Sequence, residues 1–237
     1  MPELVVDFIT SLDGYGAAEG WPGWWGLESQ EYLQWLSEHP ERDYTLLMGA
    51  NTYRLMYGFA SQVQADAEEM SAEDSSFDRL TAQQKVVFSS TLEEPLPWAN
   101  SRLVRGEATE AVAAMKRDEA VGMRTIGSLT LCRSLLAAGL VDKFRVVVFP
   151  VITGATGRER IYDDYPDVAL DLIESRTFSG GLQLLEYARG CWRGRPADAD
   201  AVRPAHHGGR PAAGSLRFVR PTSGVGVGAF GAQLQAG

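Results

Sequence analysis

The sequence predicts an α/β fold in which helices cover both faces of a largely parallel sheet, with an antiparallel hairpin at the C-terminal edge. Short β-branched runs alternate with segments of helical periodicity along the first 188 residues. The connections between these segments are short, as they are in βαβ units. Some of the runs are apolar throughout, which is typical of strands buried on both faces of a parallel sheet.

The expected elements follow one another from the N-terminus. Residues 4–10 form an apolar run that predicts a buried strand, and the turn-rich loop 11–16 follows it. Ser29 is a suitable N-cap for a helix that carries Tyr32, Leu33 and Leu36 on one face. The next expected elements are a strand over 44–48, a short helix around 53–57, strands over 85–88 and 102–104, a helix over 108–115, a strand over 123–126, a helix opened by Gly127 and Ser128 and closed by Gly139, and a strand over 144–152. Residues 169–177 and 182–187 flank Ser179-Gly180-Gly181 and predict the closing hairpin.

Composition excludes several classes of protein. The longest apolar run, 146–152, is broken by Pro150 and falls far short of the ~18 residues of a membrane span. The first residues lack the basic and apolar regions of a secretory signal, so we expect a cytoplasmic protein. Two cysteines are too few for a disulfide framework and are expected to be free thiols. A net charge of −9 argues against binding to nucleic acid.

The last 49 residues, 189–237, differ from the rest of the chain. They contain seven Arg, no Lys, two Asp, no Glu, ten Gly and four Pro. Such chain buries too little apolar surface to offset its ordering entropy, and we expect it to be disordered. The sequence therefore predicts a folded domain over 1–188 and a Gly/Pro/Arg-rich tail over 189–237. A shifted reading frame or a cloning-derived extension would also give a tail of this composition.

Small and hydroxylic residues follow three of the expected strands. They are the segments 49–52, 89–91 and 127–130. Ligands bind beyond the carboxyl ends of strands in open α/β sheets, where helix N-termini offer N–H groups to anions. The three segments can therefore cradle phosphate groups, or they can simply be caps and turns. Their spacing matches neither the dinucleotide fingerprint nor the P-loop.

Four segments together resemble the dihydrofolate reductase-like superfamily, and in particular the reductase domain of the bifunctional riboflavin-biosynthesis deaminase–reductase. The resemblance covers about residues 3–188. The matching segments are the loop Ser11-Leu12-Asp13-Gly14, the junction 47–53 (LMGANTY), the strand and loop 85–92 (KVVFSSTL), and the run 126–154, which carries Gly127-Ser128, Leu135-Leu136, Gly139-Leu140-Val141-Asp142 and a PVITG sequence. The last run is the most specific, because several unrelated spacings agree over about 30 residues.

The resemblance implies an NADPH-dependent reductase that acts on a pterin- or pyrimidine-like small molecule, and a homodimer. It places the nicotinamide beside the backbone of Asp13 and Gly14. The cofactor's phosphates and riboses would lie against Gly49, Asn51, Thr52, Ser89, Ser90, Gly127, Ser128, Leu129 and Thr130, with Arg105 as a further contact. Two other functions stay open: a non-catalytic nucleotide-binding module, and a broader carbonyl- or drug-modifying reductase on the same fold.

The chain departs from the family pattern at two places. Ala50 stands where the family usually has an arginine that binds the 2′-phosphate of the cofactor, so NADH is not excluded as the reductant. Ser128 and Leu129 stand where dihydrofolate reductases have successive glycines, which favours the riboflavin branch.

The proton donor has two candidates. Glu31, chosen over Glu28, lies in the first turn of the expected helix, where a solvated acid is also common. Asp13 lies in the loop after the first strand, where Asp-Gly is also an ordinary turn.

Aromatic and histidine residues outside these motifs give weaker signals. Trp21, Trp24 and Trp25 form an aromatic segment that suits a substrate lid, a core plug or a dimer contact. The histidines have no companion ligands at metal-binding spacing, so we expect no metal site.

Overall fold

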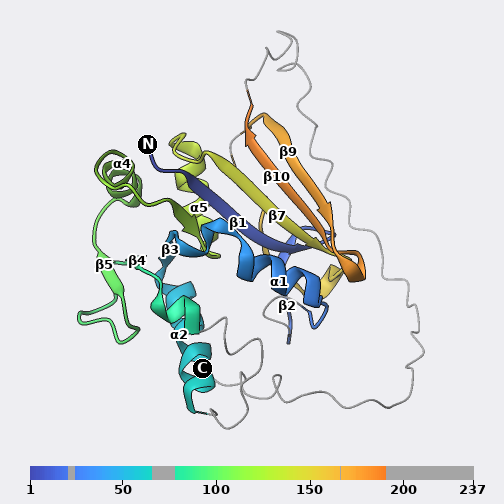
Figure 1. Cartoon of the computed structure of the whole chain (residues 1–237), viewed down its shortest axis with the longest axis horizontal. Helices are drawn as coiled ribbons and strands as arrows, with labels where there is room; N and C mark the ends of the chain where they lie inside the picture. Colours follow the sequence, from blue (N-terminus) through green and yellow to red (C-terminus); the bar gives the residue numbers. More distant parts are fainter. Residues whose placement is uncertain (21–24, 66–77, 166, 191–237) are drawn as a thin grey trace, which may run out of the picture. The chain divides into compact units, whose positions relative to one another are not determined.

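The computed structural model describes residues 1–20, 25–65, 78–165 and 167–190. An eight-stranded sheet runs through them in the order β5-β4-β3-β6-β1-β7-β10-β9 (Figure 1). Its strands are β1 (Leu4–Ser11), β3 (Thr45–Gly49), β4 (Lys85–Phe88), β5 (Ser101–Val104), β6 (Met123–Thr125), β7 (Lys143–Phe149), β9 (Leu170–Thr177) and β10 (Gln183–Arg189). The six strands from β5 to β7 are mutually parallel, and β10 and β9 continue the sheet antiparallel. The predicted α/β class and the predicted hairpin are confirmed.

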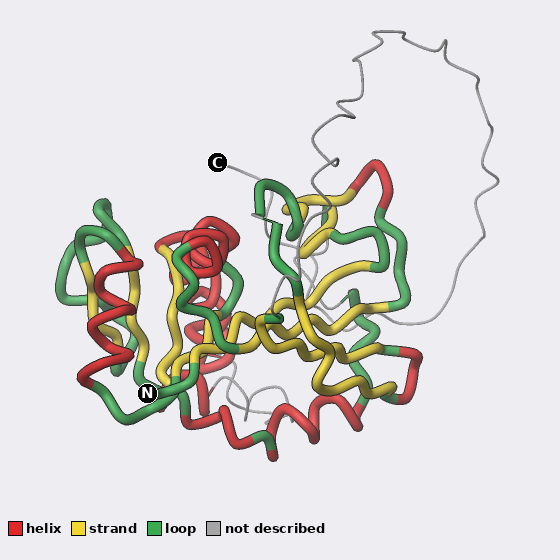
Figure 2. The backbone as a smooth tube through the Cα atoms, turned by 90° about the horizontal axis from the view of Figure 1, so that it is seen from above, coloured by secondary structure: helices red, strands yellow, loops and turns green. Residues whose placement is uncertain are grey.

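Helices cover both faces of this sheet, as Figure 2 shows from above. On one face α4 (Ala108–Asp118) and α5 (Leu129–Ala137) pack on even-numbered residues of β1, such as Val6 and Phe8. On the other face α1 (Gln30–Glu38) packs against Val147 and Phe149 of β7. Beside it, α2 (Ala50–Ala65) packs on β3 and β4. The two-residue alternation of the strands therefore supplies both cores.

Local signals placed the start of α1 and the end of α5 correctly. The Ser29 hydroxyl accepts a hydrogen bond from the N–H of Tyr32 at 3.2 Å and caps α1, as predicted. Gly139 follows α5 with φ +70° and ends that helix. Helix α2 continues to residue 65, much further than the short helix expected around 53–57. Strand β7 ends at Phe149, before Pro150, because proline cannot continue the ladder of hydrogen bonds.

Sequence reasoning missed a second, two-stranded sheet. Strand β2 (Tyr15–Ala18) pairs antiparallel with β8 (Gly157–Arg160). Half of the four residues of β8 are arginine, and β2 contains one glycine and two alanines, so neither has the β-branched pattern that marks a strand. This two-stranded sheet is held to the loop that follows β1, because the carbonyl oxygen of Gly14 accepts a hydrogen bond from the N–H of Ile161 at 3.0 Å.

The closing hairpin is tight. Strands β9 and β10 are joined through a 3-10 turn, η3 (Ser179–Gly181), in which Gly180 and Gly181 have φ values of +82° and +83°. Strand β10 ends at Arg189, beside the predicted domain boundary at 188. The predicted tail lies outside the described residues from position 191 onward, so its disorder stays a prediction. None of the described helices is long and apolar enough to cross a membrane.

Candidate functional site

Two of the predicted junctions meet at the carboxyl edge of the sheet. Strands β3 and β6 are parallel neighbours, and their C-terminal ends are joined by side-chain contacts. The N–H of Gly49 donates to Ser128 Oγ at 2.8 Å, and the Ser128 hydroxyl donates to Thr52 Oγ1 at 2.8 Å. The structure therefore brings together Gly49, Thr52 and Ser128, which are distant in sequence. We call these residues, with Gly127, the cradle.

The backbone of the cradle has an unusual conformation. Gly127 and Ser128 both lie in the left-handed region, with φ values of +54° and +64°. A Cβ at position 127 would lie 3.3 Å from Thr52 Oγ1, so a larger residue would fit only if the Thr52 side chain moved by a few tenths of an ångström. The Ser128 side chain does not cap α5, because it is bonded to Gly49 and Thr52 instead. The first N–H groups of α5, at Leu129 and Thr130, are therefore available to an anion.

The third predicted junction forms a turn beside the cradle. The Ser89 hydroxyl accepts hydrogen bonds from the N–H groups of Thr91 (3.0 Å) and Leu92 (3.1 Å). Arg105 donates to the carbonyl oxygens of Ser90 (3.2 Å) and Leu92 (2.7 Å). Arg105 thus fixes the shape of this turn, and its predicted contact with a cofactor is not needed to explain its position.

Helix α2, which begins beside the cradle, carries an arginine, Arg54, that sequence reasoning did not select. Asn51 Oδ1 accepts a hydrogen bond from Arg54 Nη1 at 3.3 Å.

Asp13 binds the loop after β1 to the loop after β7. Its carboxylate accepts hydrogen bonds from the hydroxyl of Ser11 (2.6 Å) and from the N–H groups of Thr153 (3.1 Å) and Gly154 (2.8 Å). Burial alone would raise the pKa of Asp13, but these hydrogen bonds lower it to about 2. The carboxyl group is therefore ionised at neutral pH and holds the two loops together.

Gly14, the next residue, has φ +86° and lies under the ring of Tyr162, which a Cβ would meet at 3.2 Å. The same edge exposes two large apolar side chains that sequence reasoning did not select, Leu12 (64% exposed) and Ile152 (70% exposed). Their loops are joined by a hydrogen bond from the N–H of Leu12 to the carbonyl oxygen of Val151 at 2.8 Å. Exposed apolar residues at a ligand-binding edge are candidates for contact with a planar ring.

The two acids near the start of α1 differ in their surroundings. Glu31 Oε2 accepts a hydrogen bond from the N–H of Ser179 at 2.8 Å and so ties α1 to η3. Glu28 Oε2 is buried and has no hydrogen-bond partner among the described residues. The structure therefore gives Glu31 a structural partner and leaves a Glu28 oxygen without one.

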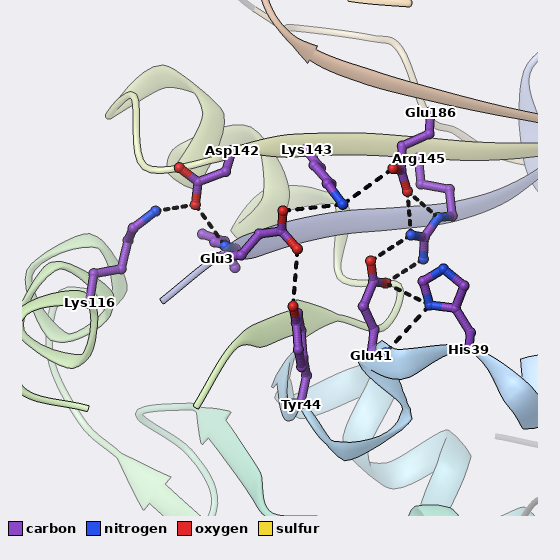
Figure 3. Close-up of polar contacts among 10 residues, drawn as sticks. Glu3, His39, Glu41, Tyr44, Lys116, Asp142, Lys143, Arg145 and Glu186 are labelled. Atoms are coloured by element: carbon purple, nitrogen blue, oxygen red, sulfur yellow. Dashed lines mark hydrogen bonds and ion pairs between the residues drawn. The ribbon is translucent and has the colours of Figure 1, made fainter. Parts of the chain in front are cut away.

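A cluster of ionisable groups surrounds Arg145 (Figure 3), whose guanidinium lies 5.2 Å from the centre of the Trp35 ring in α1. Charges alternate in sign across four neighbouring strands, from Arg124 of β6 through Asp7 and Arg145 to Glu186 of β10. Glu41, from the 3-10 turn η1 (Pro40–Asp43), completes this set with hydrogen bonds of 2.5 and 2.7 Å to Arg145. We call these five residues the charge ladder. Sequence reasoning missed it, although Asp7 and Arg145 both interrupt apolar strands.

The charge ladder sets two arginines against three carboxylates, and Lys143 adds a further cation 3.4 Å from Glu186. The Arg145 side chain is 1% exposed and is held between Glu41 and Glu186, as Figure 3 shows. Burial would lower the pKa of Arg145, but Asp7, Glu41 and Glu186 raise it above its ordinary value. Burial would likewise raise the pKa of Glu41, yet Arg145 holds it below its ordinary value. Each charge depends on its neighbours, which is the behaviour of a structural ion network.

Three further residues that the sequence analysis singled out are buried, and their contacts are explained by the fold. Lys85 is buried and donates from Nζ to the carbonyl oxygens of Leu80, Thr81 and Gln83 at 2.6–3.0 Å. Cys132 is buried under the cradle, and burial raises its thiol pKa to about 12. Trp25 is buried against Phe149, with ring centroids 5.5 Å apart, which supports a core role for this tryptophan. Trp21 and Trp24 lie outside the described residues.

No three His, Cys, Asp or Glu residues in the part of the chain that the structure describes are grouped to hold a metal ion. His206 and His207 lie outside those residues.

Known proteins resemble this chain over the described domain. The family model of the RibD C-terminal domain matches residues 2–184. Uncharacterized protein YyaP of Bacillus subtilis (strain 168) is 24% identical over 189 residues, which cover 78% of this chain and 93% of that protein. A putative riboflavin biosynthesis protein from Shewanella sp. PV-4 superposes with a TM-score of 0.58 and 19% identity, covering 80% of this chain and 99% of its own. A pyrimidine reductase-like protein from Corynebacterium diphtheriae gives a TM-score of 0.54 and 15% identity, covering 80% and 92%.

Proposed function

This chain belongs to the RibD C-terminal domain family and has its dihydrofolate reductase-like fold, and we propose that it is an NADPH-dependent reductase of a pyrimidine- or pterin-like small molecule. The relative from Corynebacterium diphtheriae is described as pyrimidine reductase-like, which favours a pyrimidine over a pterin. A cytoplasmic location and a homodimer are parts of the same proposal.

One observation carries the proposal. The cradle joins the ends of β3 and β6 through Ser128, and the resulting left-handed turn leaves the first N–H groups of α5 uncapped. A helix N-terminus with free N–H groups favours a diphosphate, as dinucleotide cofactors carry. The residues present therefore fit the cofactor that the resemblance implies.

The bound cofactor would supply the hydride, and the chain would bind and orient the two reactants. Gly49, Thr52, Gly127 and Ser128 would hold the dinucleotide at the cradle. Asp13 fixes the loop after β1 and so sets the position of the Gly14 backbone, beside which the nicotinamide is proposed to lie. Leu12 and Ile152 would give the substrate ring an apolar surface and exclude water from it.

We propose that the proton donor is one of the two acids near the start of α1, Glu31 or Glu28. Asp13 is ionised at neutral pH, so we assign it to positioning rather than to proton donation. Glu31 is the acid predicted from the sequence, and its hydrogen bond to Ser179 would have to be kept or exchanged during turnover. The unpartnered oxygen of Glu28 makes that residue the matched alternative. Glu31→Gln and Glu28→Gln, compared by kcat at several pH values, separate the two.

The decisive experiment measures cofactor binding and turnover in sequence. Calorimetric titration with NADPH is expected to show saturable binding, and Gly127→Ala is expected to weaken it. NADPH consumption is then measured with a deaminated ribosylaminopyrimidine and with dihydrofolate side by side. Binding without consumption would favour the non-catalytic module, consumption with neither class but with simple carbonyls would favour the broader reductase, and absence of binding up to millimolar cofactor would overturn the proposal.

A further inference from the structure

Arg54 lies beside the cradle and has surroundings unlike those of most other arginines of the domain. It is exposed on the second turn of α2, the helix that starts at Ala50. Its guanidinium donates to Asn51 Oδ1 at 3.3 Å and to Thr91 Oγ1 at 3.5 Å. It therefore reaches from the junction after β3 to the turn after β4.

The charge of Arg54 is not neutralised by any carboxylate of the described residues. Seven other arginines there do have a carboxylate within ion-pair distance: Arg102, Arg124, Arg133, Arg145, Arg158, Arg160 and Arg176. The first turn of α2 contains no acidic residue, although the chain as a whole carries a charge of −9. A positive charge that no carboxylate neutralises attracts anions to its place, all the more in an acidic protein.

The neighbouring hydroxyls extend this positive group into a small polar surface. Thr91 Oγ1 lies 3.3 Å from Ser89 Oγ, so a second hydroxyl lies next to the one that Arg54 contacts. The bonds from Arg54 to Asn51 and Thr91 are long and join it to neutral, exposed partners. A phosphate would replace them with charge-assisted, bidentate bonds, which are shorter and stronger.

We propose that Arg54 binds the phosphate monoester on the adenosine ribose of the cofactor, in place of the arginine that the family pattern has at position 50. This inference rests on the proposed function and adds to it a residue that selects NADPH over NADH. Arg54 lies one helical turn after Ala50, so the two residues share a face of α2. On that face the Arg54 side chain reaches Thr91 in the turn after β4. Ser89 and Thr91 would share the phosphate oxygens with it.

The test uses ligands that differ only in the 2′-phosphate. The full-length protein and its Arg54→Gln variant are titrated by calorimetry with 2′,5′-ADP and with 5′-AMP. Loss of one charge-assisted contact is expected to weaken 2′,5′-ADP binding by about tenfold or more and to leave 5′-AMP binding unchanged. Arg102→Gln, which removes an exposed arginine paired with Glu119 on β5, is the matched control and is expected to change neither affinity.

A second variant adds a rescue. In the Arg54→Gln background, Ala50→Arg is expected to restore the preference for 2′,5′-ADP, because it returns a guanidinium to the position used in the family. Equal weakening of both ligands by Arg54→Gln, or no weakening, would overturn the inference while NADPH binding still supports the proposed function. If the unmodified protein binds neither NADPH nor 2′,5′-ADP, the proposed function itself is wrong, and the role of Arg54 is wrong with it.

Discussion

The charge ladder and the cradle use polar residues in opposite ways. In the charge ladder, Arg145 is buried and each nitrogen of its guanidinium donates to a carboxylate from a neighbouring strand or from η1. In the cradle the polar side chains are uncharged, and the first N–H groups of α5 have no side-chain cap. Buried charge is tolerated only when it is compensated internally, whereas a binding edge keeps donors free for a ligand. The ladder therefore stabilises the fold, and the cradle is the place where a ligand fits.

The largest expected effect comes from removing the centre of the charge ladder. Arg145→Met leaves the buried carboxylate of Glu41 without its arginine and that of Glu186 with only Lys143, 3.4 Å away, and is expected to lower the free energy of unfolding by about 3–5 kcal/mol. Urea denaturation at pH 7.5 measures the change. Arg102→Met removes an exposed pair with Glu119 and is expected to lower stability by less than about 1 kcal/mol. Equal losses in the two variants would show that the ladder is no more important than a surface ion pair.

The cradle should show the reverse pattern, with a large loss of binding and a smaller loss of stability. Gly127→Ala places a Cβ in a left-handed residue, 3.3 Å from Thr52 Oγ1, at a stability cost of about 1–2 kcal/mol. NADPH affinity, measured by calorimetry, is expected to fall by at least about tenfold, because the turn that presents the α5 N–H groups is displaced.

Gly58→Ala is the matched control for that substitution. Gly58 lies within α2, and a Cβ there meets nothing within 4 Å. Alanine is the better helix former, so stability is expected to stay equal or rise, with unchanged NADPH affinity. An affinity loss in Gly58→Ala as large as in Gly127→Ala would mean that the cradle is not the binding site.

These two regions also differ in how far the sequence predicts them. The cradle was predictable because Gly49, Thr52 and Gly127 follow strands, and the carboxyl ends of parallel strands meet at one edge. The bonds that join Gly49 and Thr52 to the Ser128 hydroxyl were not predictable, since a sequence does not show which neighbour a hydroxyl selects. The same is true of Asp13, whose partners at 153 and 154 come from a distant loop.

The charge ladder was predictable from the sequence, although it was not predicted. Asp7 stands within an apolar run of β1 and Arg145 within one of β7, and a charge inside a buried strand needs a partner on an adjacent strand. The register confirms this, because Asp7 lies directly opposite Arg145. Strand β8 left no such signal, since its residues Gly157–Arg160 are mostly charged and exposed.

Adding a positive charge next to the cradle, at position 50, is expected to strengthen cofactor selection rather than weaken binding, and by a smaller amount. Ala50→Arg in the unmodified protein adds a second guanidinium at the start of α2 and is expected to shift the NADPH-over-NADH preference by about 1–2 kcal/mol. The ratio of kcat/KM for the two cofactors measures it. An unchanged ratio would show that a side chain at position 50 does not face the 2′-phosphate.

The smallest expected effect is a pH dependence at the margin of the charge ladder. His39 packs against Trp35 at a tilt of 49°, with ring centroids 4.5 Å apart, and its Nδ1 accepts a hydrogen bond from the N–H of Glu41 at 3.4 Å. Burial lowers the pKa of His39 below its ordinary 6.5, and the nearby Glu41 offsets this only in part. The unfolded chain therefore binds the His39 proton at a higher pH than the folded chain does. The stability from neutral His39 is present above pH 6.5 and declines as the pH falls from there towards the lower folded pKa.

His39→Gln removes this titration while keeping a polar side chain. Urea midpoints of the two proteins, compared between pH 7.5 and pH 5.5, are expected to fall less steeply for the variant. Parallel curves would mean that His39 has the same pKa in the folded and unfolded chain, and that the charge ladder ends at Glu41. A steeper fall in the variant would mean that protonated His39 joins the ladder as a further cation beside Glu41, 3.7 Å away, so the sign of the difference decides whether the histidine borders this ion network or belongs to it.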